Sequence, residues 1–178
     1  MITDPVKIAQ LKTLALADPV ASTYFDGLHD QELANWFNQS TAYVVWKSST
    51  PASDVFDAIN WASLTPADAP DGTAIYTNRV LACQGKQFNI QLLTMGREHI
   101  TSNKASVRNG IKDALQNVPA GAGGAMLDAG WTAVKTAMTR TVTRAEQLWA
   151  EGTGTFASPG ALTFEGLIDW QTASWVRS

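Results

Sequence analysis

The feature that most constrains the fold is an apolar repeat in the second half of the chain. Its members lie three or four residues apart: Leu127, Trp131, Val134, Met138, Val142, Ala145 and Trp149. Side chains at this spacing share one face of an α-helix, so the pattern predicts a single amphipathic helix from about residue 125 to residue 150. Such a helix must bury its apolar face against other elements of the fold.

A second long helix is predicted from about residue 73 to residue 97. Its apolar side chains follow a seven-residue recurrence with one additional member: Ala74, Leu81, Phe88, Leu92 and Met95. This recurrence also follows one face of a helix. We expect the two long helices to form the rigid part of a bundle.

Shorter helices are predicted elsewhere in the chain. Residues 4–39 contain three start signals before apolar stripes and should form three short helices, and 53–61 and 102–118 should form one helix each. Residues 41–47 are rich in β-branched and aromatic types, which fit either a strand or a buried helical turn. The sequence as a whole predicts an all-α fold, a helical bundle with two long amphipathic helices and an extended C-terminal arm.

The composition of the chain changes after Glu151. The stretch GTGTFASPG has too few apolar residues for a core, and an apolar tail follows it. An apolar tail on a flexible joint docks on its own domain or on a neighbour, and Trp is a favoured anchor. We therefore predict a helical bundle domain over residues 1–151 and a flexible docking arm over residues 152–178. The candidate partner-binding residues of the arm are Phe164, Leu167, Ile168, Trp170 and Trp175.

Composition favours assembly over nucleic-acid binding. Charged residues make up only 16% of the chain, against about a quarter in ordinary domains, and there are seven Trp. Amphipathic surface of this kind can be covered by assembly. The net charge of −3 argues against a broad basic surface for nucleic acid. No uninterrupted apolar stretch is long enough for a membrane span, and Asp4 and Pro5 stand where a signal peptide would carry basic residues, so we expect synthesis in the cytoplasm and no membrane partner.

Residues that carry catalysis are scarce in the sequence. His29 and His99 are far apart and neither belongs to a metal-ligand spacing, while Cys83 has no CxxC partner. We therefore predict no catalytic residue, no cofactor and no metal site, and a protein that is not an enzyme. The alternative is a small cytoplasmic helical enzyme or regulator whose site assembles only in space, with His99, Arg97 and Glu98 as the place to look.

Three stretches together resemble a known group of proteins. They are DAINW at 57–61, NKASVRNGIKDAL at 103–115 and TRAEQLWAEGTGTFASPGALTFEG at 143–166. Together with the predicted all-α fold, they resemble small structural proteins of tailed bacteriophages. The likeness covers roughly residues 54–168 and includes no catalytic motif, and residues 1–40 show no such likeness.

Within that group, the resemblance implies a head–tail connector, also called an adaptor or head-completion protein. Such subunits form a homo-oligomeric ring of about a dozen copies below the portal protein. The implied location is the head–tail junction of the virion, and the implied partners are the portal protein and a tail or neck protein. Packaged DNA passing through the channel would contact the ring without sequence specificity. Another neck, tail or capsid-associated structural protein is the alternative within the same group.

Overall fold

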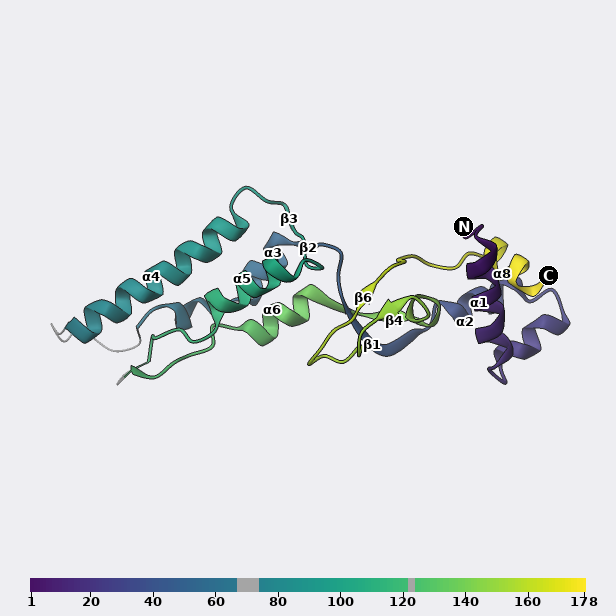
Figure 1. The fold of residues 1–178 in the computed structure, drawn as a ribbon, viewed down its shortest axis with the longest axis horizontal. Helices are drawn as coiled ribbons and strands as arrows, with labels where there is room; N and C mark the ends of the chain where they lie inside the picture. The colour runs from purple at the N-terminus through teal and green to yellow at the C-terminus, as the bar shows by residue number, and fades with distance from the viewer. Residues whose placement is uncertain (67–73, 122–123) are drawn as a thin grey trace. The chain divides into compact units, whose positions relative to one another are not determined.

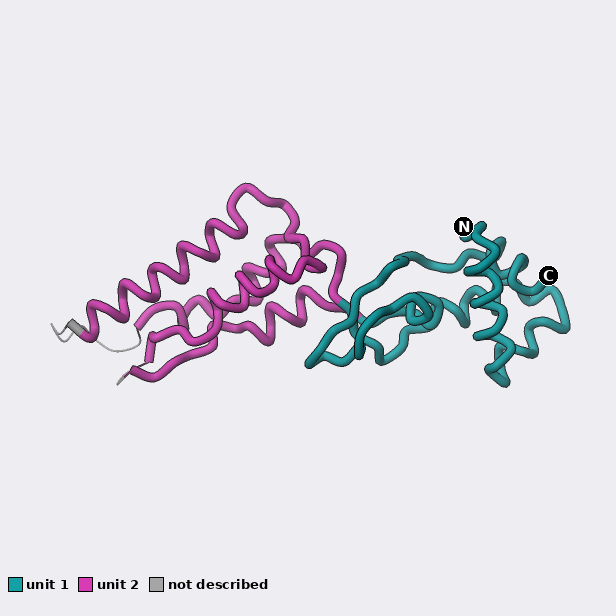
Figure 2. The backbone as a smooth tube through the Cα atoms, in the orientation of Figure 1, with its two compact units in different colours: residues 1–45, 141–178 teal, residues 46–140 magenta. Residues whose placement is uncertain are grey.

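The chain folds into two compact units. The computed structural model describes residues 1–66, 74–121 and 124–178 (Figure 1). Unit 1 consists of residues 1–45 and 141–178, and unit 2 consists of residues 46–140 (Figure 2). Both ends of the chain therefore belong to unit 1, and unit 2 is inserted between its two segments.

Unit 1 is built around short helices that contribute to one apolar core. They are α1 (Pro5–Leu16), the 3₁₀ helix η1 (Ala21–Asp26), α2 (Asp30–Phe37), α7 (Arg144–Gln147) and α8 (Trp170–Arg177). The start of α1 follows the predicted signal, because a carboxylate oxygen of Asp4 accepts from the Val6 N–H at 2.9 Å and Pro5 occupies the first turn. The prediction of three short helices over residues 4–39 is confirmed.

Two small sheets accompany these helices. The strands β1 (Ser40–Trp46) and β4 (Thr139–Thr143) pair with each other, and the chain leaves unit 1 and returns to it along them. The strands β5 (Ala150–Glu151) and β6 (Ala161–Leu162) form an antiparallel pair. The open question about residues 41–47 is thereby answered, because residues 41–46 lie in the strand β1 and Lys47 directly follows it.

Unit 2 places helices around a second core. Its elements are β2 (Thr50–Pro51), α3 (Ala52–Ala58), the 3₁₀ helix η2 (Trp61–Leu64), α4 (Ala74–Thr94), β3 (His99–Ile100), α5 (Ala105–Leu115) and α6 (Trp131–Met138). β2 pairs antiparallel with β3, with Thr50 opposite Ile100. The long helix α4 packs along α5, as Figure 1 shows, and Ile90 and Ile111 are among the fully buried side chains.

The prediction of an all-α bundle is wrong, because the described residues form a mixed fold of helices and small two-stranded sheets. The predicted helix over residues 125–150 divides into α6, β4 and α7. Its middle, TRTVT, consists mainly of β-branched residues, which prefer strand geometry, and Thr143 then starts a new helix as an N-cap. The apolar repeat identified buried positions correctly, since Val134, Met138, Val142 and Ala145 are buried, but not their conformation.

The other long helix is present but presents its repeat differently. α4 begins at Ala74, and residue 73 and the side chain of Ala74 lie outside the described part of the chain. The repeat that was expected to join the two long helices lies on the exposed side of α4, with Leu81 60% and Phe88 57% exposed. The core side of the helix instead carries Cys83 and Ile90, which are buried.

The prediction of an extended C-terminal arm is also wrong, because residues 152–178 belong to unit 1 and end in a packed helix. α8 contacts both α2 and α1. Ile168, Ala173 and Val176 are buried in the same cluster as Leu11 and Phe37. The apolar tail thus has a core to join, and this core is completed by the N-terminal helices of the same chain.

Polar contacts hold the end of the chain in the same place. Arg177 Nε donates to Asp30 Oδ1 at 2.7 Å, and this hydrogen bond holds the pKa of Asp30 below its usual value. Asp169 caps α8, and hydrogen bonds from Thr172 are the main cause of its own lowered pKa. The Met1 ammonium lies 3.3 Å from Asp169 Oδ2. Both carboxylates therefore favour the packed position of α8 in their charged form.

Candidate functional site

Unit 1 carries a groove along α1 that has a polar and an apolar part. The polar part has a volume of about 660 Å³ and the apolar part about 790 Å³. Leu14, Ala17 and Leu148 line both parts, so the two parts adjoin each other. We call the two parts together the α1 groove.

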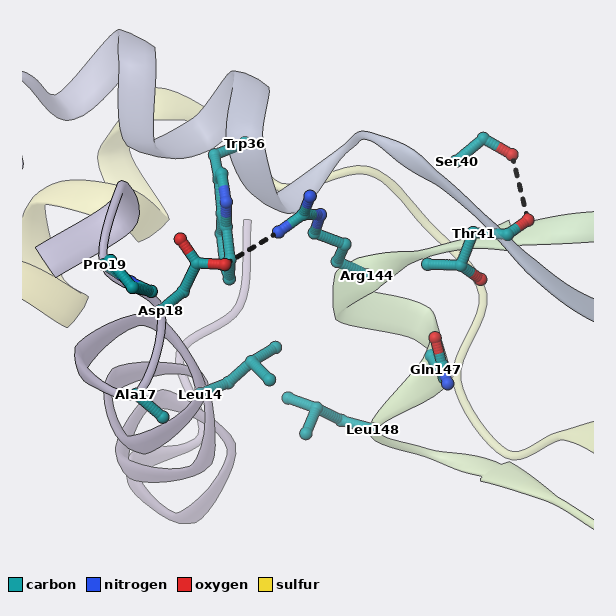
Figure 3. Close-up of a pocket in the computed structure, with 10 residues that line it drawn as sticks. All are labelled: Leu14, Ala17, Asp18, Pro19, Trp36, Ser40, Thr41, Arg144, Gln147 and Leu148. Atoms are coloured by element: carbon teal, nitrogen blue, oxygen red, sulfur yellow. Dashed lines mark hydrogen bonds and ion pairs between the residues drawn. The ribbon is translucent and has the colours of Figure 1, made fainter.

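The polar part is organised by a cation between a carboxylate and an indole ring. Arg144 Nη1 lies 3.3 Å from Asp18 Oδ2, and the guanidinium carbon lies 4.5 Å from the centre of the Trp36 ring (Figure 3). Backbone N–H groups of Ala21 and Val20 also donate to Asp18, and together with Arg144 they lower the pKa of this carboxyl. Asp18 therefore stays charged and balances the charge of Arg144, which argues against a dedicated anion site here.

A capping box fixes the part of the chain that supplies Arg144 and Leu148. The Thr143 hydroxyl oxygen accepts from the Glu146 N–H at 3.2 Å, and Glu146 Oε2 accepts from the Thr143 N–H at 3.0 Å. The other carboxylate oxygen of Glu146 accepts from the Gly166 N–H at 3.2 Å, and the residue is only 3% exposed. α7 is thus anchored to the segment that precedes α8, which makes this wall of the groove rigid.

The apolar part of the groove is lined without any charged side chain. Val6 is 64% and Leu148 37% exposed there. Its polar side chains already have partners, because Gln10 Oε1 accepts from Trp149 Nε1 at 2.7 Å and the Thr13 hydroxyl donates to the Ala9 carbonyl at 3.0 Å. Such a surface suits apolar side chains of a macromolecule better than a small polar ligand, which needs convergent free polar groups.

Unit 2 carries a second apolar surface on α4. We call it the α4 stripe and define it as Leu81, Phe88, Leu92 and Met95, which are 54–68% exposed. The exposed side chains of residues 75–95 include no charged group. Ordinary protein surfaces carry charges on about a quarter to a third of their residues, so this face is poorly adapted to water.

The two charged residues of α4 are used on its inner side. Arg79 Nη1 donates to the Gly121 carbonyl at 2.6 Å and is buried. Lys86 Nζ donates to the carbonyls of Asp113 and Gln116, at 2.5 and 2.7 Å, where α5 ends. A cation at the C-terminal end of a helix satisfies carbonyls that lack intrahelical partners and interacts favourably with the helix dipole.

The five predicted partner-binding residues differ in how far they are exposed. Ile168 is 3% exposed and belongs to the core of unit 1, and Phe164 packs edge-on against Trp149 with ring centres 5.0 Å apart. Leu167, Trp170 and Trp175 are exposed, at 71%, 55% and 41%. A role in partner binding stays a prediction for all five, and these three have surface free for it.

The residues considered for chemistry are dispersed. His29 Nδ1 lies 3.8 Å from Glu32 Oε2. Arg97, Glu98 and His99 are all exposed where β3 begins. Over residues 1–66, 74–121 and 124–178, no group of three or more His, Cys, Asp or Glu side chains is placed to hold a metal ion. Within the same ranges, no helix combines the length and the apolar character needed to cross a membrane.

Sequence reasoning found one of the two surfaces and missed the other. The seven-residue repeat marked the α4 stripe, although it was assigned to the core. The α1 groove was missed because its walls come from α1 and from Leu148, which are distant in sequence. The uncharged run of exposed Val6, Ala9 and Thr13 at three- and four-residue spacing is the signal that could have identified one wall.

No known protein family matches the chain, and neither a curated protein nor a solved structure matches it. The resemblance to phage proteins therefore rests on the three sequence stretches alone. These stretches lie at the end of α3, along α5, and from the N-cap of α7 to beyond β6. They contribute to both units, and the surfaces of the two units provide the physical argument about function.

Proposed function

We propose that the protein is a structural subunit of a tailed-bacteriophage virion, a head–tail connector that forms a ring below the portal and links the DNA-filled head to the tail. The observation that carries the proposal is the α4 stripe, four large apolar side chains more than half exposed on an uncharged helix face. A face of this kind is stabilised when another protein surface covers it.

A second feature supports a ring in particular. A closed ring of identical subunits is held by heterologous contacts, in which each copy uses two different surfaces. This chain has two uncharged apolar surfaces, the apolar part of the α1 groove in unit 1 and the α4 stripe in unit 2. The resemblance of residues 57–61, 103–115 and 143–166 to phage structural proteins supplies the biological setting.

The proposal is tested with the full chain and the portal protein of the same phage. The mass of the purified protein is measured by light scattering and native mass spectrometry, alone and after mixing with portal. We expect a discrete ring of about a dozen copies, formed in solution or on the portal. A chain that stays monomeric both alone and after mixing with portal would contradict the proposal.

Electron cryomicroscopy of the intact particle then gives the position. Density for this fold between portal and tail supports the connector role. Density elsewhere in the neck, tail or capsid identifies another structural component of the particle and overturns the connector. Absence of the protein from purified particles would overturn the structural role altogether.

A further inference from the structure

We infer that the α4 stripe of one copy packs into the apolar part of the α1 groove of the next copy. This inference rests on the proposed ring, since it names the two surfaces that meet there. A heterologous contact needs a projecting surface and a recessed one that complement each other. α4 supplies a ridge of side chains, and α1 with Leu148 supplies a groove.

The two surfaces match in charge. No charged side chain lines the apolar part of the groove, and none is exposed along residues 75–95. Contact between them would therefore bury no unpaired charge. Burying an unpaired charge carries a large cost in binding free energy. The Gln10 carbonyl oxygen and the Thr13 hydroxyl hydrogen already have hydrogen-bond partners within the chain, so neither needs a partner from the second copy.

The two surfaces also match in length. α1 has 12 residues and extends roughly 18 Å, and the stripe from Leu81 to Met95 extends roughly 21 Å. The four stripe side chains expose on the order of 400 Å², about half of the roughly 800 Å² per partner of a standard interface. The groove volume of about 790 Å³ admits several large side chains.

The alternative occupant of the α4 stripe is the same stripe of a second copy. The seven-residue recurrence would permit such helix pairing. That contact is isologous, however, so it closes a dimer and cannot by itself propagate around a ring. It would also leave the α1 groove uncovered, whereas the heterologous contact covers both surfaces.

Two single substitutions and two matched controls test the inference. Phe88→Asp places a carboxylate on the stripe and Val6→Asp places one in the groove, and both side chains are more than half exposed in the subunit. Asn89→Asp adds the same charge one residue further along α4, turned by about 100° around the helix from Phe88. Leu28→Asp does so at an exposed leucine of unit 1 outside the groove. Circular dichroism verifies that each variant is folded.

We expect each of Phe88→Asp and Val6→Asp to weaken association between copies at least about a hundredfold, because each buries an unpaired carboxylate in an apolar contact. The two controls should assemble like the unaltered chain. Mixing the two defective variants should restore one contact only, since one copy keeps its groove and the other keeps its stripe. The product should be a 1:1 pair with the mass of two chains.

The alternatives give different results. If Val6→Asp assembles normally while Phe88→Asp does not, the stripe pairs with itself or with another surface and the inference is wrong. If both variants form rings as the unaltered chain does, the inference is wrong but the proposed ring stands. If the unaltered chain forms no ring alone or on the portal, the proposed function fails as well.

Discussion

Ile168→Ala measures how firmly the C-terminal segment is held by unit 1. Ile168 is 3% exposed in the core cluster that also contains Phe37 and Val176. Its backbone is fixed by Asn38, whose Nδ2 donates to the Ile168 carbonyl at 2.7 Å and whose Oδ1 accepts from the Ile168 N–H at 2.8 Å. The Ile168 side chain is thus buried in the core, and Asn38 holds its backbone in place.

The expected cost follows from the atoms removed. Ile→Ala deletes three carbon atoms, which at about 0.8 kcal/mol each gives roughly 2.4 kcal/mol of lost transfer free energy. The cavity left behind adds to this, so we expect a loss of about 3–4 kcal/mol in the free energy of unfolding of unit 1. The adjacent Leu167 is 71% exposed, and Leu167→Ala should change the same quantity by less than about 0.5 kcal/mol.

Hydrogen exchange followed by mass spectrometry provides a readout specific to unit 1. Peptides that cover α2 and α8 should lose protection by about a hundredfold or more in Ile168→Ala, because each 1.4 kcal/mol corresponds to about tenfold. Peptides from α4 and α5 serve as an internal reference in unit 2. Equal, small effects of Ile168→Ala and Leu167→Ala would show that the segment is not packed as described, and the reasoning would be refuted.

Three further predictions concern charge and burial. The lowered pKa values of Asp30 and Asp169 mean that these groups stabilise unit 1 above the unfolded-state pKa near 3.9, so stability should be lost as the pH falls below about 4; a melting temperature that does not change over that range would contradict this. Glu146→Ala should cost about 2–4 kcal/mol in urea unfolding because two N–H groups lose their acceptor, and Glu146→Gln should cost less. Burial raises the pKa of the Cys83 thiol, so its reaction with a disulfide reagent at neutral pH should be slow until denaturant is added; rapid reaction of the folded protein would refute its burial.

The sequence determined burial in the second half of the chain better than it determined conformation. Met138 and Val142 lie on one face of an ideal helix, and both are buried, yet the chain becomes a strand after Met138. A repeat of three and four residues does not distinguish a continuous helix from a helix followed by a short strand whose inward residues fall in register. The β-branched content of TRTVT was the local signal against a helix.

The C-terminal segment shows a second limit. Its apolar residues were recognised, but whether they join a core in their own chain depends on contacts with α1 and α2, more than 100 residues away. No local pattern in residues 162–176 specifies that contact. The Asp30–Arg177 ion pair is likewise visible only once the two ends of the chain are brought together, whereas the Asp169 cap is local to the start of α8.

Charged side chains ordinarily mark the helix face that meets water. In α4 they lie on the opposite, inner face. Its cations, Arg79 and Lys86, lie on the inner side because they satisfy backbone carbonyls of neighbouring segments in unit 2. Fixing these cations inward leaves the outward face of the helix with neutral polar and apolar side chains only. A subunit that remained alone in water would gain solubility from charges on that face. The lack of such charges on this face is therefore the main support for the proposed contact between copies.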